Sequence, residues 1–506
     1  MLQSDSGLDW SSYLVMGLYL VAMIGLGSWF GRGKVDTETY LLGGRCMPWW
    51  VVGISYLVSV FSTVSLVSGP GEAYEHGATL GLATIIAPIA SIFAFLIFVR
   101  FYFKHRIFTP FDYLERRFDA RVRGIVAAMF CLTRLTYLAM VLYASAKILQ
   151  GAAGWPIWIT IIAVGMIGVV YTVMGGIRAV IWTDLIQFVV LVGGLAWITV
   201  VLCEQVPGGA QGVISTAQAH DHLFPDLNKA EFYTFDPRVR LTLGFILIIY
   251  ICEALMYNSG DQIALQRLLS TSSYEAAWKS LLTYAGVLLP FLSVFWFVGI
   301  GVYSFYMHQP EAVRPERGDL ALFNFIATEL PHPVPGLILS AMLAAAMSTL
   351  DSGMNSLATV MTKDFYLRFL RPEATEERQV AISRWLTFLI GGGAIIASLA
   401  IYVVSEWAED TIMEAMMIWG SFSALIAPIF LLGVTSRRLR ARHVLVSLGI
   451  GTIVLLGLLT WRMLRGDELS FIVVTPFTLL VTVAVGYAMT PFVKPLPREE
   501  TRDLTY

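Results

Sequence analysis

The stretch that decides the fold covers residues 344–362 and reads A-A-A-M-S-T-L-D-S-G-M-N-S-L-A-T-V-M-T. It lies in a long apolar segment, yet polar side chains recur in it at steps of three and four residues. That spacing places them on one side of a helix. The polar positions are Ser348, Asp351, Ser352, Asn355, Thr359 and Thr362.

A stripe of hydroxyls with a carboxylate needs a partner inside a membrane, because an ionised aspartate near the bilayer centre costs about 2.5 to 3.5 kcal/mol. Hydroxyl, carbonyl and carboxylate oxygens suit a hard cation better than a metal that prefers histidine or cysteine. A seam of small residues that hydrogen-bond between packed helices gives the same pattern. The stripe by itself leaves both interpretations open, a cation site and a helix–helix seam.

The composition identifies a polytopic membrane protein. Of the 506 residues, 57% are hydrophobic and 14% are charged, and the mean hydropathy is +0.70. A soluble protein of this length would be far more polar. The net charge of −2 gives no reason to expect nucleic acid as a partner. The seven histidines lie in loops or at the ends of apolar runs, and no cofactor motif is present, so we expect no enzyme.

Apolar runs of about 20 residues can cross a bilayer, and the chain contains about thirteen such runs. They cover residues 10–31, 49–70, 79–103, 123–151, 155–174, 180–203, 241–259, 278–306, 334–362, 383–404, 412–434, 443–461 and 470–492. Most lysines and arginines fall in alternate loops, which the positive-inside rule places in the cytoplasm. This distribution predicts an outside N-terminus, a cytoplasmic C-terminus and an odd number of spans. The first apolar run has no signal-peptide features and is expected to be retained.

Two of these runs look interrupted. The run 49–70 carries six hydroxyl side chains and ends at a proline, and the run 241–259 is followed by G-D-Q. If the first run is set aside, the two interruptions fall in the first helix of two successive five-helix sets, 49–203 and 241–434. Matching broken helices are typical of inverted-repeat transporters. We therefore expect a single transmembrane domain, with one extra helix at 10–31 and two more within 443–492.

Three motifs give the chain a resemblance to a known family. They are Y-T-V-M-G-G-I-R-A-V-I-W-T-D-L-I-Q at 171–187, D-Q-I-A-L-Q-R at 261–267 and A-A-A-M-S-T-L-D-S at 344–352. Together they resemble the sodium:solute symporter family. The resemblance implies an all-α protein with the leucine-transporter-type fold, a five-plus-five inverted repeat. It also implies sodium-coupled import of a small polar organic solute, such as a sugar, sialic acid or another carboxylate, by alternating access.

The same resemblance implies a cellular location and a set of binding partners. The expected location is the plasma membrane, most simply a bacterial inner membrane, and the expected partners are the lipid bilayer, the solute and one or two sodium ions. No obligate protein partner is expected. A membrane sensor derived from a transporter and a polytopic membrane enzyme are the alternatives.

The resemblance also assigns residues to sodium. The first sodium site is similar to the family pattern at the carbonyls of Val58, Phe61 and Ala345 and the hydroxyls of Ser348 and Thr349. A second site, present in some members, maps to Asp184, Ser348, Asp351 and Ser352. The sialic acid carriers have serine where this chain has Asp351, so the added carboxylate could strengthen a second site or make it sensitive to protons. For Asp184, a cap or hydrogen bond at the start of its helix segment is the structural alternative.

The solute cavity is expected between the broken helices and their core partners. The residues assigned to it are Ser62, Ser65, Thr84, Arg134, Tyr137, Tyr257, Asn258 and Asp261. Tyr257 is similar to the aromatic inner gate of the galactose carrier, but Thr84 replaces a glutamate of that carrier. Arg134, an arginine within a span, could bind a carboxylate of the solute. Its structural alternative is an ion pair with Glu253.

Overall fold

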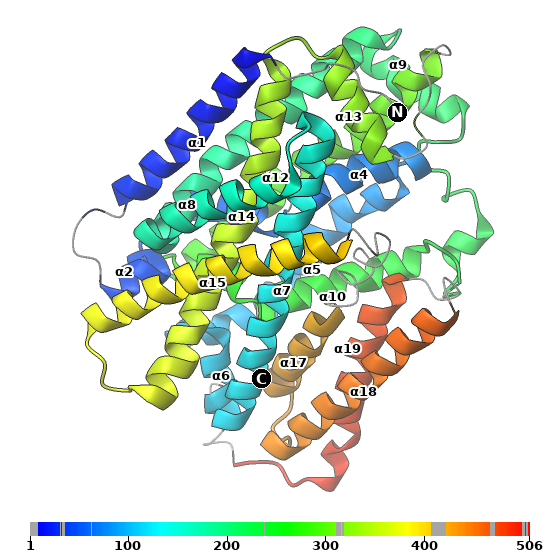
Figure 1. The fold of residues 1–506 in the computed structure, drawn as a ribbon. Coiled ribbons are helices and arrows are strands. Elements are labelled where there is room, and N and C mark those ends of the chain that lie inside the picture. The colour runs from blue at the N-terminus through cyan, green and yellow to red at the C-terminus, as the bar shows by residue number, and fades with distance from the viewer. Residues whose placement is uncertain are drawn as a thin grey trace.

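The structure, a computed structural model, is built of helices throughout the residues that it describes (Figure 1). It describes residues 9–30, 32, 36–61, 63–236, 238–309, 315, 318–405, 421–465, 471–497, 501, 504 and 505. Ser62, which sequence analysis assigned to the solute cavity, and the first part of the expected span 412–434 lie outside these residues.

The helices form one bundle. Their bounds are α1 Trp10–Phe30, α2 Thr37–Leu42, α3 Trp49–Val60, α4 Thr63–His76, α5 Ala83–Lys104, α6 Pro110–Arg117, α7 Ala120–Ala153, α8 Ile157–Gln205, α9 Gly209–Ala219, α10 Leu243–Ser259, α11 Gln262–Leu269, α12 Tyr274–His308, α13 Gly318–Glu329, α14 Val334–Val360, α15 Glu376–Ser405, α17 Ile426–Thr435, α18 Ala441–Arg465 and α19 Phe471–Ala488. Short 3-10 turns and one π-helical segment, Met361–Leu370, connect some of them. Among the described residues nine helices are long and apolar enough to cross a membrane, or up to eleven if each bent pair is one span.

The helix α14, which contains the opening stretch, runs through the middle of the bundle (Figure 1). Nearly all its residues are buried, and its most extensive packing is against α8. Small residues allow this close approach: a Cβ on Gly194 of α8 would lie 3.5 Å from the Cβ of Ala341. A helix that is apolar and buried on all sides has no face for lipid. Its polar side chains must therefore find partners within the protein.

Both predicted interruptions are present. Helix α3 ends where Phe61 adopts an extended conformation, with φ −107° and ψ 110°, and α4 resumes at Thr63. Helices α10 and α11 are bent by 56° relative to each other, with Gly260 and Asp261 between them. An interrupted helix leaves backbone groups without their usual partners, and such backbone is tolerated at membrane depth only inside protein or beside water.

The predicted spans at 155–174 and 180–203 correspond to the two helical arms of α8, a run of 49 residues with a kink at Gly176. Gly176 has φ 58° and ψ −158°, a conformation that is essentially restricted to glycine. The change of direction is made at this one residue, so no connecting loop is needed.

Helices α9 and α13 lie at one end of the bundle and α6 lies at the other (Figure 1). The long connection 203–240 contains α9 and a 3-10 turn, Ala230–Tyr233. The C-terminal pair α18 and α19 packs together at the edge of the bundle.

Candidate functional site: two buried polar clusters

The five residues assigned to a first sodium ion lie on α3 and α14, which are in contact. All five are buried: Val58, Phe61, Ala345, Ser348 and Thr349. The Val58 carbonyl accepts a bond of 3.2 Å from the Phe61 amide, and the Thr349 hydroxyl donates to the Ala345 carbonyl at 3.1 Å. Carbonyl and hydroxyl oxygens keep further lone pairs when they take part in one hydrogen bond. This donor set fits a hard, singly charged cation.

The residues assigned to a second sodium ion form a tight cluster between α8 and α14. Ser348 Oγ donates to Asp184 Oδ1 at 2.8 Å, and the amide and hydroxyl of Ser352 bond to Asp351 Oδ1 at 2.6 and 3.3 Å. The other oxygen of Asp351 accepts a bond of 2.6 Å from the hydroxyl of Tyr171. Asp184 lies well inside α8, so the alternative role at the start of a helix segment is wrong.

An arginine that sequence analysis did not place at this site lies in the middle of the cluster. Arg267 Nη2 is 2.8 Å from Asp184 Oδ2 and 2.5 Å from Ser352 Oγ, while its Nε is 2.8 Å from Ser55 Oγ. Ser55 in turn donates to Asp184 at 2.5 Å. Arg267 and Asp184 are both completely buried. The guanidinium therefore holds α11, α3, α8 and α14 together at one point.

The charges of this cluster do not balance. It contains two buried carboxylates, Asp184 and Asp351, and one guanidinium. Beside them lie the buried side chains of Tyr19 and Gln187, which are close enough to hydrogen-bond to each other. Tyr19 is also close enough to both carboxylates to interact with them electrostatically. Because a buried carboxylate without a countercharge is costly, the cluster fits a further bound cation.

The glutamines of the D-Q-I-A-L-Q-R motif hold neighbouring segments, as expected. Gln266 Nε2 bonds to the Leu41 carbonyl at 2.5 Å, to Asn355 Oδ1 at 2.8 Å and to Thr359 Oγ1 at 2.9 Å. Gln262 bonds to the Phe108 carbonyl at 3.2 Å. The motif thus combines two amides that fix α11 with one arginine that enters the ion cluster.

A second polar cluster surrounds the break between α10 and α11. Arg134 of α7 hydrogen-bonds to the carboxylate of Asp261, and its guanidinium lies 5.5 Å from the ring centre of Tyr137. The expected alternative, a pair between Arg134 and Glu253, is therefore wrong. Asp261 also accepts a bond of 2.8 Å from the Ile263 amide at the start of α11. This second contact holds the carboxylate at the break, within reach of the arginine.

Further polar side chains surround this break. Tyr257 is within electrostatic reach of Glu253, Arg134 and Asp261. Asn258 donates to the Ala254 carbonyl at 3.0 Å, and it lies close enough to the Tyr56 hydroxyl for the two side chains to hydrogen-bond. The buried hydroxyl of Thr84, in the first turn of α5, has no hydrogen-bond partner among the described residues. Unsatisfied atoms of this kind are expected where a ligand or water binds.

The remaining assigned residue, Ser65, is partly buried on α4. The structure thus brings Arg134, Tyr137, Tyr257, Asn258 and Asp261 into one cluster, with Tyr56 as a member that sequence analysis missed. The signal for Tyr56 was weak, since an aromatic residue in an apolar run is usually a packing residue.

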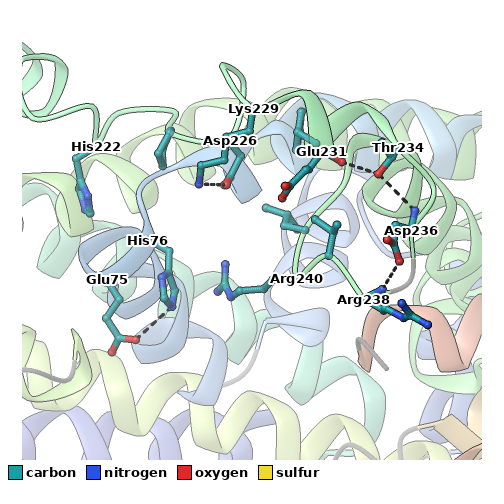
Figure 2. Close-up of a pocket in the computed structure, with 14 residues that line it drawn as sticks. Glu75, His76, His222, Asp226, Lys229, Glu231, Thr234, Asp236, Arg238 and Arg240 are labelled. Atoms are coloured by element: carbon teal, nitrogen blue, oxygen red, sulfur yellow. Dashed lines mark hydrogen bonds and ion pairs between the residues drawn. The ribbon is translucent and has the colours of Figure 1, made fainter. Parts of the chain in front are cut away.

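A hollow of about 760 Å³ opens at the end of the bundle that carries α9 (Figure 2). Its wall is formed by the last turn of α4 and by the connection that leads to α10. Most of its charged side chains have partners: Lys229 is 3.0 Å from Asp226, and Arg240 bonds to both oxygens of Glu72 at 2.5 and 2.6 Å. These contacts fasten the connection to α4, the second half of a broken helix.

Comparisons with known proteins agree with this architecture. The family model of the sodium:solute symporter family matches residues 40–451. The sodium/sialic acid symporter SiaT of Proteus mirabilis is 28% identical over 456 residues, which cover 88% of each chain. The sodium/glucose cotransporter of Vibrio parahaemolyticus is 24% identical over 474 residues, covering 88% of this chain and 84% of the relative.

A solved structure of a sodium-coupled sialic acid symporter, in a substrate-bound outward-open state, is 25% identical in sequence. It superposes with a TM-score of 0.88 and covers 96% of this chain and 98% of that chain. The family consists of sodium-coupled transporters, which excludes the alternative of a membrane enzyme. Because the family model covers most of the chain, this protein belongs to the sodium:solute symporter family.

Proposed function

We propose that the protein is a symporter that uses the sodium gradient to import a small polar organic solute by alternating access. The observation that supports this best is the pair of broken helices, α3–α4 and α10–α11, beside the polar face of α14. Broken helices free backbone carbonyls for a cation, and their two halves can move separately. In this proposal the helices form a five-plus-five inverted repeat, with about thirteen spans and the N-terminus outside. The protein lies in a plasma membrane, in bacteria the inner membrane.

The first sodium ion binds in this proposal between α3 and α14, at the carbonyls of Val58, Phe61 and Ala345 and the hydroxyls of Ser348 and Thr349. An ion held by both helices favours the arrangement in which they are close together. Its release allows them to separate. If solute binds the same arrangement, sodium and solute each raise the affinity for the other by the same factor.

A second sodium ion binds in this proposal at Asp184, Asp351 and Ser352, near Arg267. The carboxylate that the single guanidinium of Arg267 leaves without a countercharge supports it. Arg267 neutralises one carboxylate, and the ion neutralises the other. The stoichiometry is then two sodium ions for each solute molecule.

The substitution Asp351→Asn tests the second ion. It keeps the shape of the side chain and removes its charge, so we expect the sodium concentration for half-maximal uptake to rise about tenfold or more. The Hill coefficient for sodium should fall from near two to one. The measurement is solute uptake into proteoliposomes, with potassium replacing sodium as the baseline.

The matched control is Glu373→Gln, which removes a negative charge from an exposed position. It should leave both sodium parameters unchanged. A Hill coefficient that stays the same in Asp351→Asn would exclude the second site and leave the first site standing. Uptake that does not depend on sodium in the unmodified protein would exclude the symporter itself.

A further inference from the structure

Glu253 is an acid in the middle of α10 that none of the sites above uses. It is partly buried, and it faces away from Ile251, which is 47% exposed on the outer surface of the same helix. The carboxylate makes no hydrogen bond or ion pair with any described residue. An acid without a partner is costly inside a membrane protein unless it has a function.

The surroundings of Glu253 are aromatic and polar. Three tyrosines lie close enough to interact with its charge: Tyr250 and Tyr257 on α10 and Tyr284 on α12. The ring of Tyr284 packs against that of Tyr56 on α3, with 4.8 Å between the ring centres. Glu253 therefore shares one face of α10 with Tyr250 and Tyr257, three residues before it and four after it, and it is within electrostatic reach of Tyr284 on α12.

Helix α5 completes these surroundings. Ala254, the residue next to Glu253, packs against Ala90 and Ala94 of α5. Small residues at such a contact bring two helices close together. Helix α10 is thus held close to α5 beside the position of Glu253.

The cation that could have neutralised Glu253 is engaged elsewhere. Arg134 bonds to Asp261, and Tyr257 is within electrostatic reach of both of them and of Glu253. The cluster around the second break therefore holds two carboxylates and one guanidinium. A solute that carries a negative charge would meet an arginine already paired and an acid that repels it.

We infer that Glu253 binds the transported solute, and that the solute presents a hydrogen-bond donor to it and carries no net negative charge. Hydroxyl groups of a neutral sugar or polyol and the ammonium group of an amine share this chemistry. A carboxylate accepts hydrogen bonds from both, and the tyrosine rings can pack against a sugar face or an ammonium group. The inference rests on the proposed symport function and makes its solute class more specific.

The test compares the unmodified protein with Glu253→Gln in a thermal-shift screen, followed by uptake into proteoliposomes. The solutes are neutral sugars and polyols, amino sugars and other amines, and carboxylates that include sialic acid, each in sodium and in potassium. We expect sodium-dependent stabilisation by a neutral or amine-bearing solute and none by the carboxylates at the same concentration. Glu253→Gln should weaken the apparent affinity for that solute about tenfold or more.

Two controls separate binding from folding. Sodium alone should stabilise Glu253→Gln as it does the unmodified protein, because the sodium residues lie on other helices. Glu204→Gln removes an exposed acid at the end of α8 and should change nothing. A Glu253→Gln variant that loses the response to sodium as well would show a structural role and overturn the inference.

The remaining outcomes distinguish this inference from the proposed function. Selective, sodium-dependent uptake of a carboxylate, unchanged or improved in Glu253→Gln, would overturn the inference and leave the symporter intact. A neutral or amine-bearing solute whose affinity is the same in Glu253→Gln would also overturn it. If no solute gives sodium-dependent stabilisation or uptake, the symporter proposal fails, and the inference fails with it.

Discussion

Replacing Arg267 by methionine is expected to lower the free energy of unfolding by about 3 to 5 kcal/mol, the usual cost of leaving a buried charge without its partner. The substitution removes the guanidinium from Asp184, Ser55 and Ser352 at once. Asp184 and Asp351 would then remain in the interior with no positive side chain in the cluster. The measurement is thermal unfolding of the purified protein in detergent, with sodium present and absent.

Arg240→Met is the matched control. Arg240 also forms an ion pair, with Glu72, but its side chain is 51% exposed. Pairs of this kind contribute only about 0 to 1 kcal/mol. The double variant Asp184→Asn with Arg267→Met should regain a large part of the lost stability, because it no longer leaves Asp184 charged. If Arg267→Met unfolded at the same temperature as the unmodified protein, the cluster would not have the charges assigned to it.

Gly176→Ala is expected to have the second large effect. An alanine at φ 58° and ψ −158° costs about 1 to 3 kcal/mol in backbone strain alone. In addition, its Cβ would lie 2.6 Å from the carbonyl oxygen of Tyr40 and 2.8 Å from the Tyr40 ring. Backbone cannot move aside as a flexible side chain can. We expect a clear fall in the unfolding temperature and loss of sodium-dependent uptake, since both arms of α8 meet at this residue.

Gly193→Ala tests the same replacement on the same helix. Gly193 is helical, and a Cβ there would have no neighbour within 4 Å among the described residues. Alanine in a regular helix is more favourable than glycine by about 0.5 to 1 kcal/mol, so this variant should be neutral or slightly more stable. Equal unfolding temperatures for the two variants would contradict the explanation given for Gly176.

The fold could be predicted from the sequence where local chemistry decides it. Hydroxyl side chains marked the break after α3, although the proline of the same run lies inside α4, and G-D-Q marked the break between α10 and α11. The single-residue turn inside α8 could not be foreseen in this way. Its sequence has two apolar runs separated by M-G-G-I-R, which usually indicates a loop, whereas the two arms meet at Gly176 alone. Only glycine fits at this turn because Tyr40, on another helix, packs directly against Gly176. A contact of this kind between distant residues cannot be read from the local sequence.

The site was predictable only in part. The periodicity of 344–362 placed Ser348, Asp351 and Ser352 on one face, and all three lie in the ion cluster. Arg267 was not assigned to an ion site, because nothing local shows that it meets Asp184, 83 residues away in the chain. The same limit applies to Arg134. Its spacing put it near the second break, but the choice between Glu253 and Asp261 as its partner is made by the bend between α10 and α11.

Because the α14 cluster has more acids than arginines, its charge makes the transport cycle sensitive to the membrane potential. With Asp184, Asp351 and Arg267 all ionised, the ion-free carrier has one negative charge in its core, and binding of one sodium ion cancels it. Moving one elementary charge across the whole membrane changes its free energy by about 2.3 kcal/mol for each 100 mV of membrane potential. An inside-negative potential would then drive the empty carrier back to face outward.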